Sequence, residues 1–150
     1  MREVKGRRLL TLDGNVFVAA LKADEPYSDD CSKILAKVPD DFILVEPSIV
    51  YLEVLGTLAR KVGVSEALVG KTMLDDMISP ILLVTCDRDF CIEAFPLCST
   101  YDVYAIDSLY LKTALDVHAI LVSLDKEDFV NRIKEKAPPI EVYHVSEFPY

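Results

Sequence analysis

Two kinds of segment alternate along this chain: short apolar runs rich in β-branched residues, and longer stretches whose apolar residues recur at helical spacing. The short runs predict strands near residues 9–12, 42–45, 81–84, 119–123 and 141–145. The longer stretches predict helices near residues 29–38, 48–62, 65–77, 88–97, 103–117 and 127–136. Such alternation favours an α/β fold, a three-layer α/β/α sandwich with a mostly parallel central sheet of about five strands.

Boundary signals support several of these helices. Gly63 can end one helix before the next begins, and candidate N-caps stand at Ser28, Ser48 and Ser65. In open parallel sheets, ligands bind beyond the carboxyl ends of the strands, near the point where the strand order reverses. Functional side chains are therefore expected directly after the predicted strands.

The composition describes a single globular domain, residues 1–150. Hydrophobic residues make up 51% and charged residues 27%, with no repetitive, Gly/Ser-rich or Pro-rich stretch, which excludes disordered and solenoid classes. The longest apolar runs are far shorter than the ~20 residues that cross a bilayer. The first residues are basic like the start of a signal peptide, but Asp13 interrupts the apolar stretch that follows. We expect no export signal, no membrane partner and a cytoplasmic location.

Cysteine spacing and net charge argue against two further kinds of site. The cysteines lack the paired spacing of a zinc site, and both histidines lie well downstream of most of them. We expect buried free thiols at Cys31, Cys86, Cys91 and Cys98. The net charge of −9 has the wrong sign for broad neutralisation of phosphates. Any contact with nucleic acid therefore depends on local basic groups or on bound metal cations.

Asp107 has the most informative surroundings of the acidic residues. On a helix over residues 103–117, its face carries Leu111 and Ala114, while Lys112 points the opposite way. A buried unpaired carboxylate is costly, so Asp107 should be paired, protonated or bound to a cation. A local salt bridge or a place near the helix start explains the pattern equally well.

The other candidate acids carry weaker signals. Glu53 shares a narrow polar strip of its helix with Thr57 and Arg60, which a solvated face explains as well as a ligand does. Asp13 and Asp125 follow apolar strands, where aspartate is also a common turn residue. These acids have no matching basic partners nearby in the sequence, so gathering them would require a cation. Mg²⁺ and Mn²⁺ prefer such oxygen ligands and leave positions for water and a phosphate.

Three segments carry a family resemblance: residues 12–18 (Leu-Asp-Gly-Asn-Val-Phe-Val), the helix at 47–54 (Pro-Ser-Ile-Val-Tyr-Leu-Glu-Val) and the stretch 106–129. Together they resemble the PIN-domain family, which contains many ribonucleases, including the VapC-like toxins of toxin–antitoxin pairs. The most specific part is the helix, strand and Ser-x-Asp turn between Asp107 and Asp125. The resemblance covers nearly the whole chain and implies a PIN-like sheet, a ribonuclease activity and Mg²⁺ or Mn²⁺ as cofactor.

The run Leu-Val-Thr-Cys-Asp-Arg-Asp-Phe at residues 83–90 looks even more like the terminal turn of that family. The matching helical position upstream is Val69, which is not acidic, and too much folded sequence follows the run. We therefore assign Asp87 and Asp89 to an ordinary helix start.

Two positions depart from the family pattern. Gly14 stands where the family more often has Thr or Ser, which removes a hydroxyl that could orient a metal-bound water and puts the catalytic rate in doubt. Ser123 replaces the commoner Thr and keeps the hydroxyl.

The expected site combines these residues. The catalytic and metal-binding carboxylates are Asp13, Glu53, Asp107 and Asp125, with Glu53 as an assistant, and the side chains that hold them in place are Asn15 and Ser123. The metal would activate water for in-line attack on a phosphodiester and stabilise the developing charge. Asp128 could add a contact, although a helix-start role fits it better.

Rival functions stay open on the sequence. A haloacid-dehalogenase-like hydrolase also has an Asp after its first strand, but it generally needs an acid where this chain has Asn15. A catalytically weak PIN scaffold that binds RNA or protein fits Gly14 and the charge of −9. A toxin and an RNA-processing nuclease remain equally open. Expected partners are RNA, an antitoxin protein and a second copy of the chain. The second copy is expected to bind through a helical hairpin over residues 54–77, whose apolar side chains should be partly exposed at Val62, Val64, Leu68 and Met73.

Overall fold

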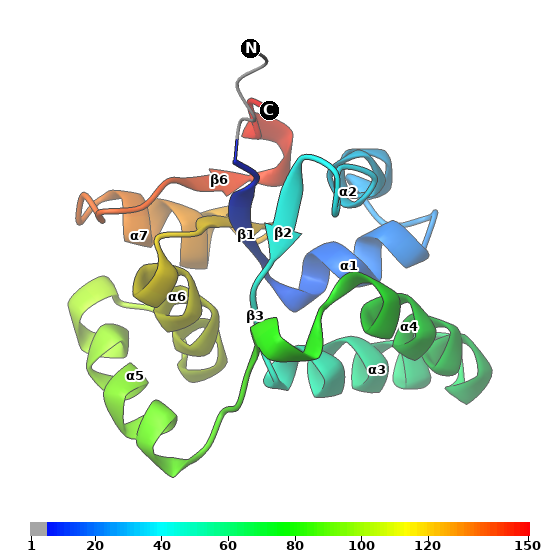
Figure 1. Ribbon diagram of the computed structural model, residues 1–150, viewed down its shortest axis with the longest axis horizontal. Helices are drawn as coiled ribbons and strands as arrows, with labels where there is room; N and C mark the ends of the chain where they lie inside the picture. Colours follow the sequence, from blue (N-terminus) through cyan, green and yellow to red (C-terminus); the bar gives the residue numbers. More distant parts are fainter. Residues whose placement is uncertain (1–5) are drawn as a thin grey trace.

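The computed structural model describes residues 6–150 and has the layered α/β arrangement that the sequence predicts (Figure 1). Residues 1–5, which begin the basic N-terminal stretch, lie outside the described residues. The central sheet has four parallel strands in the order β2-β1-β5-β6: β1 (Arg8–Leu12), β2 (Phe42–Leu44), β5 (Ile120–Ser123) and β6 (Val142–His144). A separate pair of short parallel strands consists of β3 (Glu46–Pro47) and β4 (Leu83–Val84).

The predicted strand at residues 81–84 does not join the central sheet. Pro80–Leu82 form a 3₁₀ turn, and only Leu83–Val84 pair with another strand, β3. The chain of β2 leaves β1 after Leu44 and continues as β3, so β4 finds its partner away from the main sheet. The main sheet is therefore one strand narrower than the five or so predicted, and its parallel character is confirmed.

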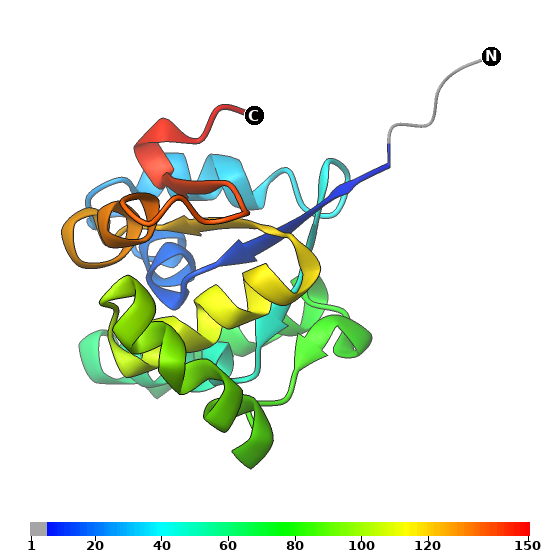
Figure 2. The same ribbon diagram turned by 90° about the vertical axis from the view of Figure 1, so that its left-hand side faces the viewer.

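Helices cover both faces of the sheet, with α2 on one side and α5 and α6 on the other (Figure 2). Their bounds are α1 (Gly14–Leu21), α2 (Ser28–Leu35), α3 (Ile49–Lys61), α4 (Val64–Met77), α5 (Arg88–Tyr101), α6 (Ala105–Val117) and α7 (Asn131–Lys134). All six predicted helices exist, although the last begins as a π-helical turn, Lys126–Val130. The sequence prediction missed α1, because this helix is apolar on nearly every side and shows no amphipathic period.

The predicted helix ends are right in part. Gly63 separates α3 from α4 and has a φ of 118°, a conformation that favours glycine. Ser48 occupies the N-cap position of α3, but its hydroxyl accepts a hydrogen bond from the Cys86 backbone N–H (3.0 Å). Ser28 and Ser65 are not N-caps, because both lie inside their helices.

The core fills the space between the sheet and its covering helices. Leu10 and Leu12 of β1, Phe17 of α1 and Leu121 of β5 are fully buried. All four cysteines are free as predicted, but of these only Cys31 is buried. None of the helices in the described part of the chain is both long and apolar enough to span a bilayer.

Candidate active site

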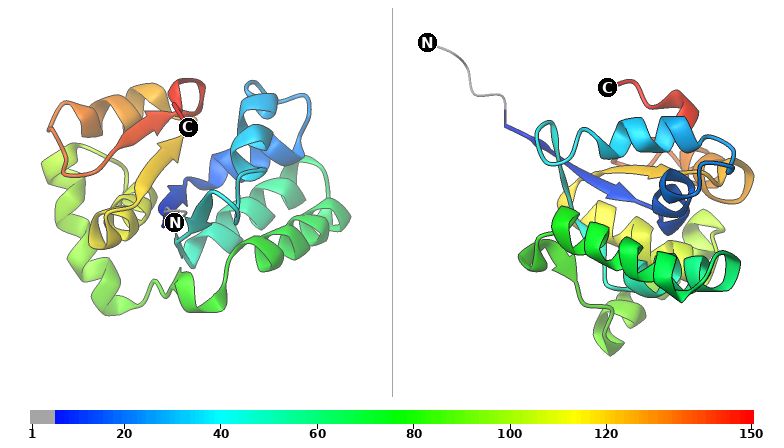
Figure 3. Two further views of the ribbon diagram at one scale, coloured as in Figure 1. Left: turned by 45° about the horizontal axis from the view of Figure 1, so that its top comes forward. Right: turned by 90° about the vertical axis from the view of Figure 1, so that its right-hand side faces the viewer.

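Asp13 stands where the topology of the sheet reverses. β1 has β2 on one side and β5 on the other, so the chain segments that leave β1 and β5 lead toward opposite edges of the sheet. The Asp13 backbone N–H donates to the Val122 carbonyl (3.0 Å), which extends the strand pairing by one residue. The chain then enters α1 directly (Figure 3). The Asp13 side chain is only 4% exposed, so its carboxylate lies at the bottom of the resulting crevice.

A single hydroxyl connects the ends of β1 and β5. The Ser123 Oγ donates to Asp13 Oδ2 (2.7 Å) and accepts from the Asp125 backbone N–H (3.0 Å). Asn15 lies beside it, and its Oδ1 accepts from the Leu124 backbone N–H (3.3 Å). Ser123 therefore orients one carboxylate directly, and both side chains fix the backbone that leads to Asp125.

Asp125 caps the helical turn that follows β5. Its Oδ1 accepts from the Asp128 backbone N–H (3.0 Å), the geometry of an N-cap. The Asp128 carboxylate forms an ion pair with Arg132 (2.8 Å), which agrees with a helix-start role for Asp128. Asp125 thus has one carboxylate oxygen in the cap and a second oxygen available to the crevice.

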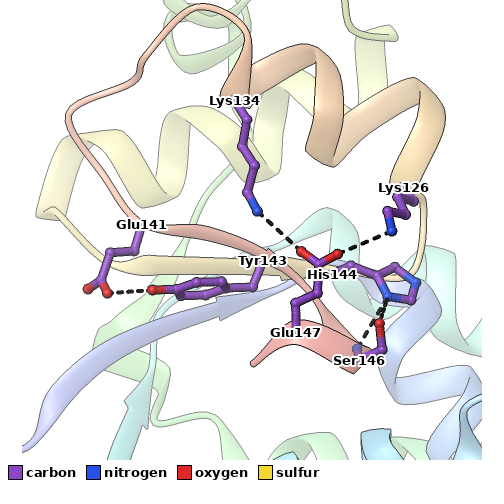
Figure 4. Close-up of polar contacts among 7 residues, drawn as sticks. All are labelled: Lys126, Lys134, Glu141, Tyr143, His144, Ser146 and Glu147. Carbon is purple, nitrogen blue, oxygen red and sulfur yellow. Dashed lines mark hydrogen bonds and ion pairs between the residues drawn. The ribbon is translucent and has the colours of Figure 1, made fainter. Parts of the chain in front are cut away.

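The C-terminal segment anchors the turn after Asp125. Figure 4 shows the Glu147 carboxylate between the amines of Lys126 and Lys134, at 3.1 and 3.3 Å. Glu147 ends the 3₁₀ turn that follows β6, in which His144 Nδ1 and Ser146 Oγ lie 2.7 Å apart. Because Lys126 directly follows Asp125, these half-exposed ion pairs connect the C-terminal segment to the turn that begins at Asp125.

Asp107 lies in the first turn of α6, since the helix begins at Ala105. Burial raises its pKa to about 7, and the negative charges of Asp125 and Glu53 add to the shift. Lys112 does point away from it, but α5 covers that face, and the Lys112 amine contacts acids other than Asp107. Asp107 therefore lies near the helix start, and among residues 6–150 it forms no ion pair. Its role as a metal ligand stays a prediction.

Glu53 projects from α3 toward the same crevice. Its Oε1 accepts a hydrogen bond from the hydroxyl of Tyr110, which is fully buried in α6 (2.6 Å). Of the residues that share its predicted polar strip, Thr57 also lines the crevice, whereas Arg60 is exposed to solvent.

The crevice is a pocket of about 220 Å³ that collects all four candidate carboxylates. Within residues 6–150 its other charged lining residues are Glu25 and Lys61, so five carboxylates face one amine. Burial raises the pKa of Asp13 well above its usual value, and the charges of Asp107 and Glu53 raise it further. The structure therefore concentrates carboxylate oxygens, and a bound cation would relieve their mutual repulsion.

These donors suit Mg²⁺ or Mn²⁺ in chemical type, since all are carboxylate oxygens. Among the described residues, no three acidic, histidine or cysteine side chains already surround a common point closely enough to hold an ion. Binding an ion therefore requires the carboxylates to rotate toward one another from their present positions.

Two polar residues beneath the site were not singled out in the sequence. Glu46 is fully buried, its Oε1 accepts from the Leu12 backbone N–H (2.6 Å), and its Oε2 has no hydrogen-bond partner among residues 6–150. It directly follows an apolar strand, the same signal that marked Asp13. Tyr110 lies one helical turn from Asp107 in α6.

Comparisons with known proteins concern the family and the fold of this chain. A family model described as the PIN domain matches residues 10–136. No curated protein sequence matches the chain. Similar solved structures include VapBC2 from Rickettsia felis bound to a DNA fragment from its promoter, with 15% identity, a TM-score of 0.63 and coverage of 91% of this chain and 98% of that one.

Two further structures show the same likeness. FitAcB from Neisseria gonorrhoeae has 17% identity and a TM-score of 0.61, covering 93% of this chain and 99% of that one. FitAB bound to an IR36 DNA fragment has 16% identity and a TM-score of 0.63, covering 95% of this chain and 98% of that one. At such low identity the likeness establishes a common fold.

Proposed function

This chain belongs to the PIN-domain family, and we propose that it is a divalent-metal-dependent endoribonuclease that hydrolyses phosphodiester bonds in RNA. The observation that carries the proposal is the pocket in which Asp13, Glu53, Asp107 and Asp125 meet. They come from four separate segments of the chain, and among the described residues none of them forms an ion pair. A cluster of this kind suits cations and, through them, phosphate groups.

The side chains of this pocket have distinct parts in the proposed reaction. Asp13, Asp107 and Asp125 hold Mg²⁺ or Mn²⁺, and Glu53 assists by binding the ion through water and by positioning the nucleophile. When bound, such an ion lowers the pKa of that water and neutralises charge at the scissile phosphate. Ser123 keeps Asp13 and the Asp125 backbone in register through its two hydrogen bonds.

Among the described residues, Lys61 is the one amine that lines the pocket, and it lies 3.4 Å from Glu25 Oε1. We assign it to a phosphate group of single-stranded or structured RNA, whose charge would compete with Glu25 for the amine. A local contact of this type is compatible with the net charge of −9, because it needs no broad basic surface.

We further propose that the protein acts as the toxin of a toxin–antitoxin pair in the cytoplasm, with RNA processing as the other possible role. The fold that it has in common with VapBC2 and FitAB supports a protein partner. The α3–α4 hairpin supports an antitoxin or a second copy as well. As predicted, it leaves apolar side chains exposed, namely Val62 (41%), Val64 (67%) and Leu68 (58%), with Met73 half-buried.

The experiment that tests the nuclease is cleavage of single-stranded RNA with Mn²⁺, comparing wild type with Asp125→Asn. We expect the substitution to lower the rate at least about 100-fold, because it removes a charged group from the reacting centre. Asp87→Asn is the matched control, since Asp87 also caps a helix by accepting from the backbone N–H three residues on (2.9 Å) but lies outside the pocket. Unchanged cleavage in Asp125→Asn would show the assignment to be wrong.

A PIN scaffold without catalysis is the second candidate function. Gly14 favours it, because this position offers no hydroxyl beside Asp13. A scaffold predicts no cleavage of RNA and no increase in melting temperature when Mn²⁺ is added to the wild type, whereas the nuclease predicts both.

A further inference from the structure

The space above Gly14 is already occupied. A Cβ atom at this position would lie 2.5 Å from Glu53 Oε1 and 3.0 Å from the Tyr110 hydroxyl. The first distance is much shorter than any ordinary van der Waals contact with a carbon atom. The present position of the Glu53 carboxylate therefore depends on the absence of a side chain at Gly14.

Tyr110 fixes that position from the opposite side. Its ring is fully buried in α6, and its hydroxyl donates a 2.6 Å hydrogen bond to Glu53 Oε1 on α3. Hydrogen bonds to a carboxylate are among the stronger ones in proteins. One carboxylate oxygen of Glu53 is thus engaged with Tyr110 and held over Gly14, which leaves the other oxygen for the pocket.

We propose that Tyr110 is a positioning residue of the active site, whose hydroxyl takes the space over Gly14 and orients Glu53 toward an ion held by the neighbouring aspartates. This inference rests on the proposed metal-dependent function. It deepens that function, because the Tyr110 hydroxyl from α6 takes the place of the hydroxyl that Gly14 lacks. Tyr110 contacts neither the ion nor the RNA and acts only through Glu53.

Loss of the hydroxyl leaves Glu53 Oε1 without its donor. The carboxylate then rotates among several conformations, and ordering it again opposes ion binding. Removing a group that orients a metal ligand typically weakens metal affinity 10–100-fold, which sets the expected size of the effect at about that range.

The test is isothermal titration of the full chain with MnCl₂, comparing Tyr110→Phe with Tyr51→Phe. Tyr51 is a matched control because its hydroxyl also donates to a carboxylate, Asp75 (2.7 Å), from the same helix as Glu53 but outside the pocket. We expect Tyr110→Phe to weaken Mn²⁺ affinity about 10–100-fold and Tyr51→Phe to leave it unchanged. A merely structural role for Tyr110 would lower the melting temperature of Tyr110→Phe without altering its Mn²⁺ affinity.

A double-mutant cycle tests whether Tyr110 acts through Glu53. In a Glu53→Gln background, Tyr110→Phe should have little further effect on Mn²⁺ affinity. An equal loss in both backgrounds would overturn the inference, as would a Tyr110→Phe variant that binds Mn²⁺ like Tyr51→Phe. A wild type that takes up no Mn²⁺ would instead overturn the proposed function, and the inference with it.

A second variant covers the case in which Tyr110→Phe does not fold. Gly14→Ala places a methyl group against Glu53 Oε1 and should displace the carboxylate, with a similar loss of Mn²⁺ affinity. Unaltered affinity in a folded Gly14→Ala variant would contradict the proposed arrangement.

Discussion

In the wild type, the free energy of unfolding should fall as the pH rises because of Glu46, and replacing Glu46 by Gln should abolish this part of the fall. Glu46 is fully buried beneath the end of β1, and its Oε1 takes the Leu12 N–H that a neighbouring strand would otherwise satisfy. Burial raises the pKa of Glu46 well above its usual value, and the charges of Asp13 and Glu53 raise it further, while the bond from Leu12 lowers it. The folded protein therefore retains a proton on Glu46 that the unfolded chain releases.

The sign and the size of the effect follow from this proton. Below the unfolded pKa of about 4.3, both states carry the proton and the stabilising contribution is fully present. As the pH rises from there toward the higher folded pKa, the unfolded state alone releases the proton, and the free energy of unfolding falls by about 1.4 kcal/mol per pH unit. Glutamine cannot titrate, so the Glu46→Gln variant should lack this part of the slope.

The assay is urea denaturation of both proteins at several pH values from 4 to 7, in EDTA so that no ion binds. The stability of Glu46→Gln relative to wild type should increase as the pH rises above about 4.3, with a slope of at most about 1.4 kcal/mol per unit, whatever the offset at pH 4. Glu135→Gln is the control, because Glu135 is exposed and its removal should leave the pH dependence parallel to wild type. A difference that stays constant, or one that shifts against the variant as pH rises, would refute a neutral buried Glu46.

Three shorter predictions concern the site and its scaffold. The pKa of Asp107 is raised to about 7, so Mn²⁺ must displace a proton from this carboxyl below that pH, and Mn²⁺ affinity should rise from pH 6 to 8 in titrations. Asp107→Asn should flatten this rise, and an unchanged rise would contradict the assignment. Ser123→Ala should lower the rate of RNA cleavage about 10–100-fold. The control Ser108→Ala loses a hydrogen bond within α6 (2.6 Å) and should not lower the rate. Equal rates for the two variants would refute the role of Ser123 in connecting Asp13 to the Asp125 backbone. Leu74→Ala should lower the free energy of unfolding by about 2–5 kcal/mol in urea, because Leu74 is fully buried, and a loss of Mn²⁺ affinity in the folded variant would contradict a purely structural role.

Much of the fold could be predicted because local patterns agree with it. Strands at residues 9–12 and 119–123 are short apolar runs, and they form the centre of the parallel sheet. α1 escaped prediction because burial on nearly all sides leaves no polar face to mark a helix. The segment at residues 81–84 has the composition of a sheet strand, but which strand it pairs with depends on where the chain bends after β2.

The site could be predicted in part. Asp13 and Asp125 were found from their places after strands, and the structure puts both in one pocket with Asp107 and Glu53. The apolar stripe around Asp107 misled in one respect, since the helix starts at Ala105 and the aspartate lies in its first turn. Whether these carboxylates bind an ion stays a prediction of the proposed function.

The support beneath the carboxylates could not be predicted. The hydrogen bond between Tyr110 and Glu53 joins helices far apart in the sequence, and only the tertiary fold brings the two side chains within reach. Glu46 directly follows a predicted apolar strand in the sequence, but no local pattern distinguishes a buried acid from a turn residue at such a position.

The central claim is that the four carboxylates form one divalent-metal site, and anomalous diffraction from a crystal soaked in MnCl₂ tests it most directly. The account predicts a manganese peak in the pocket between Asp13, Glu53, Asp107 and Asp125, with the carboxylates turned toward it. Data collected at saturating Mn²⁺ that show no peak in this pocket would contradict it.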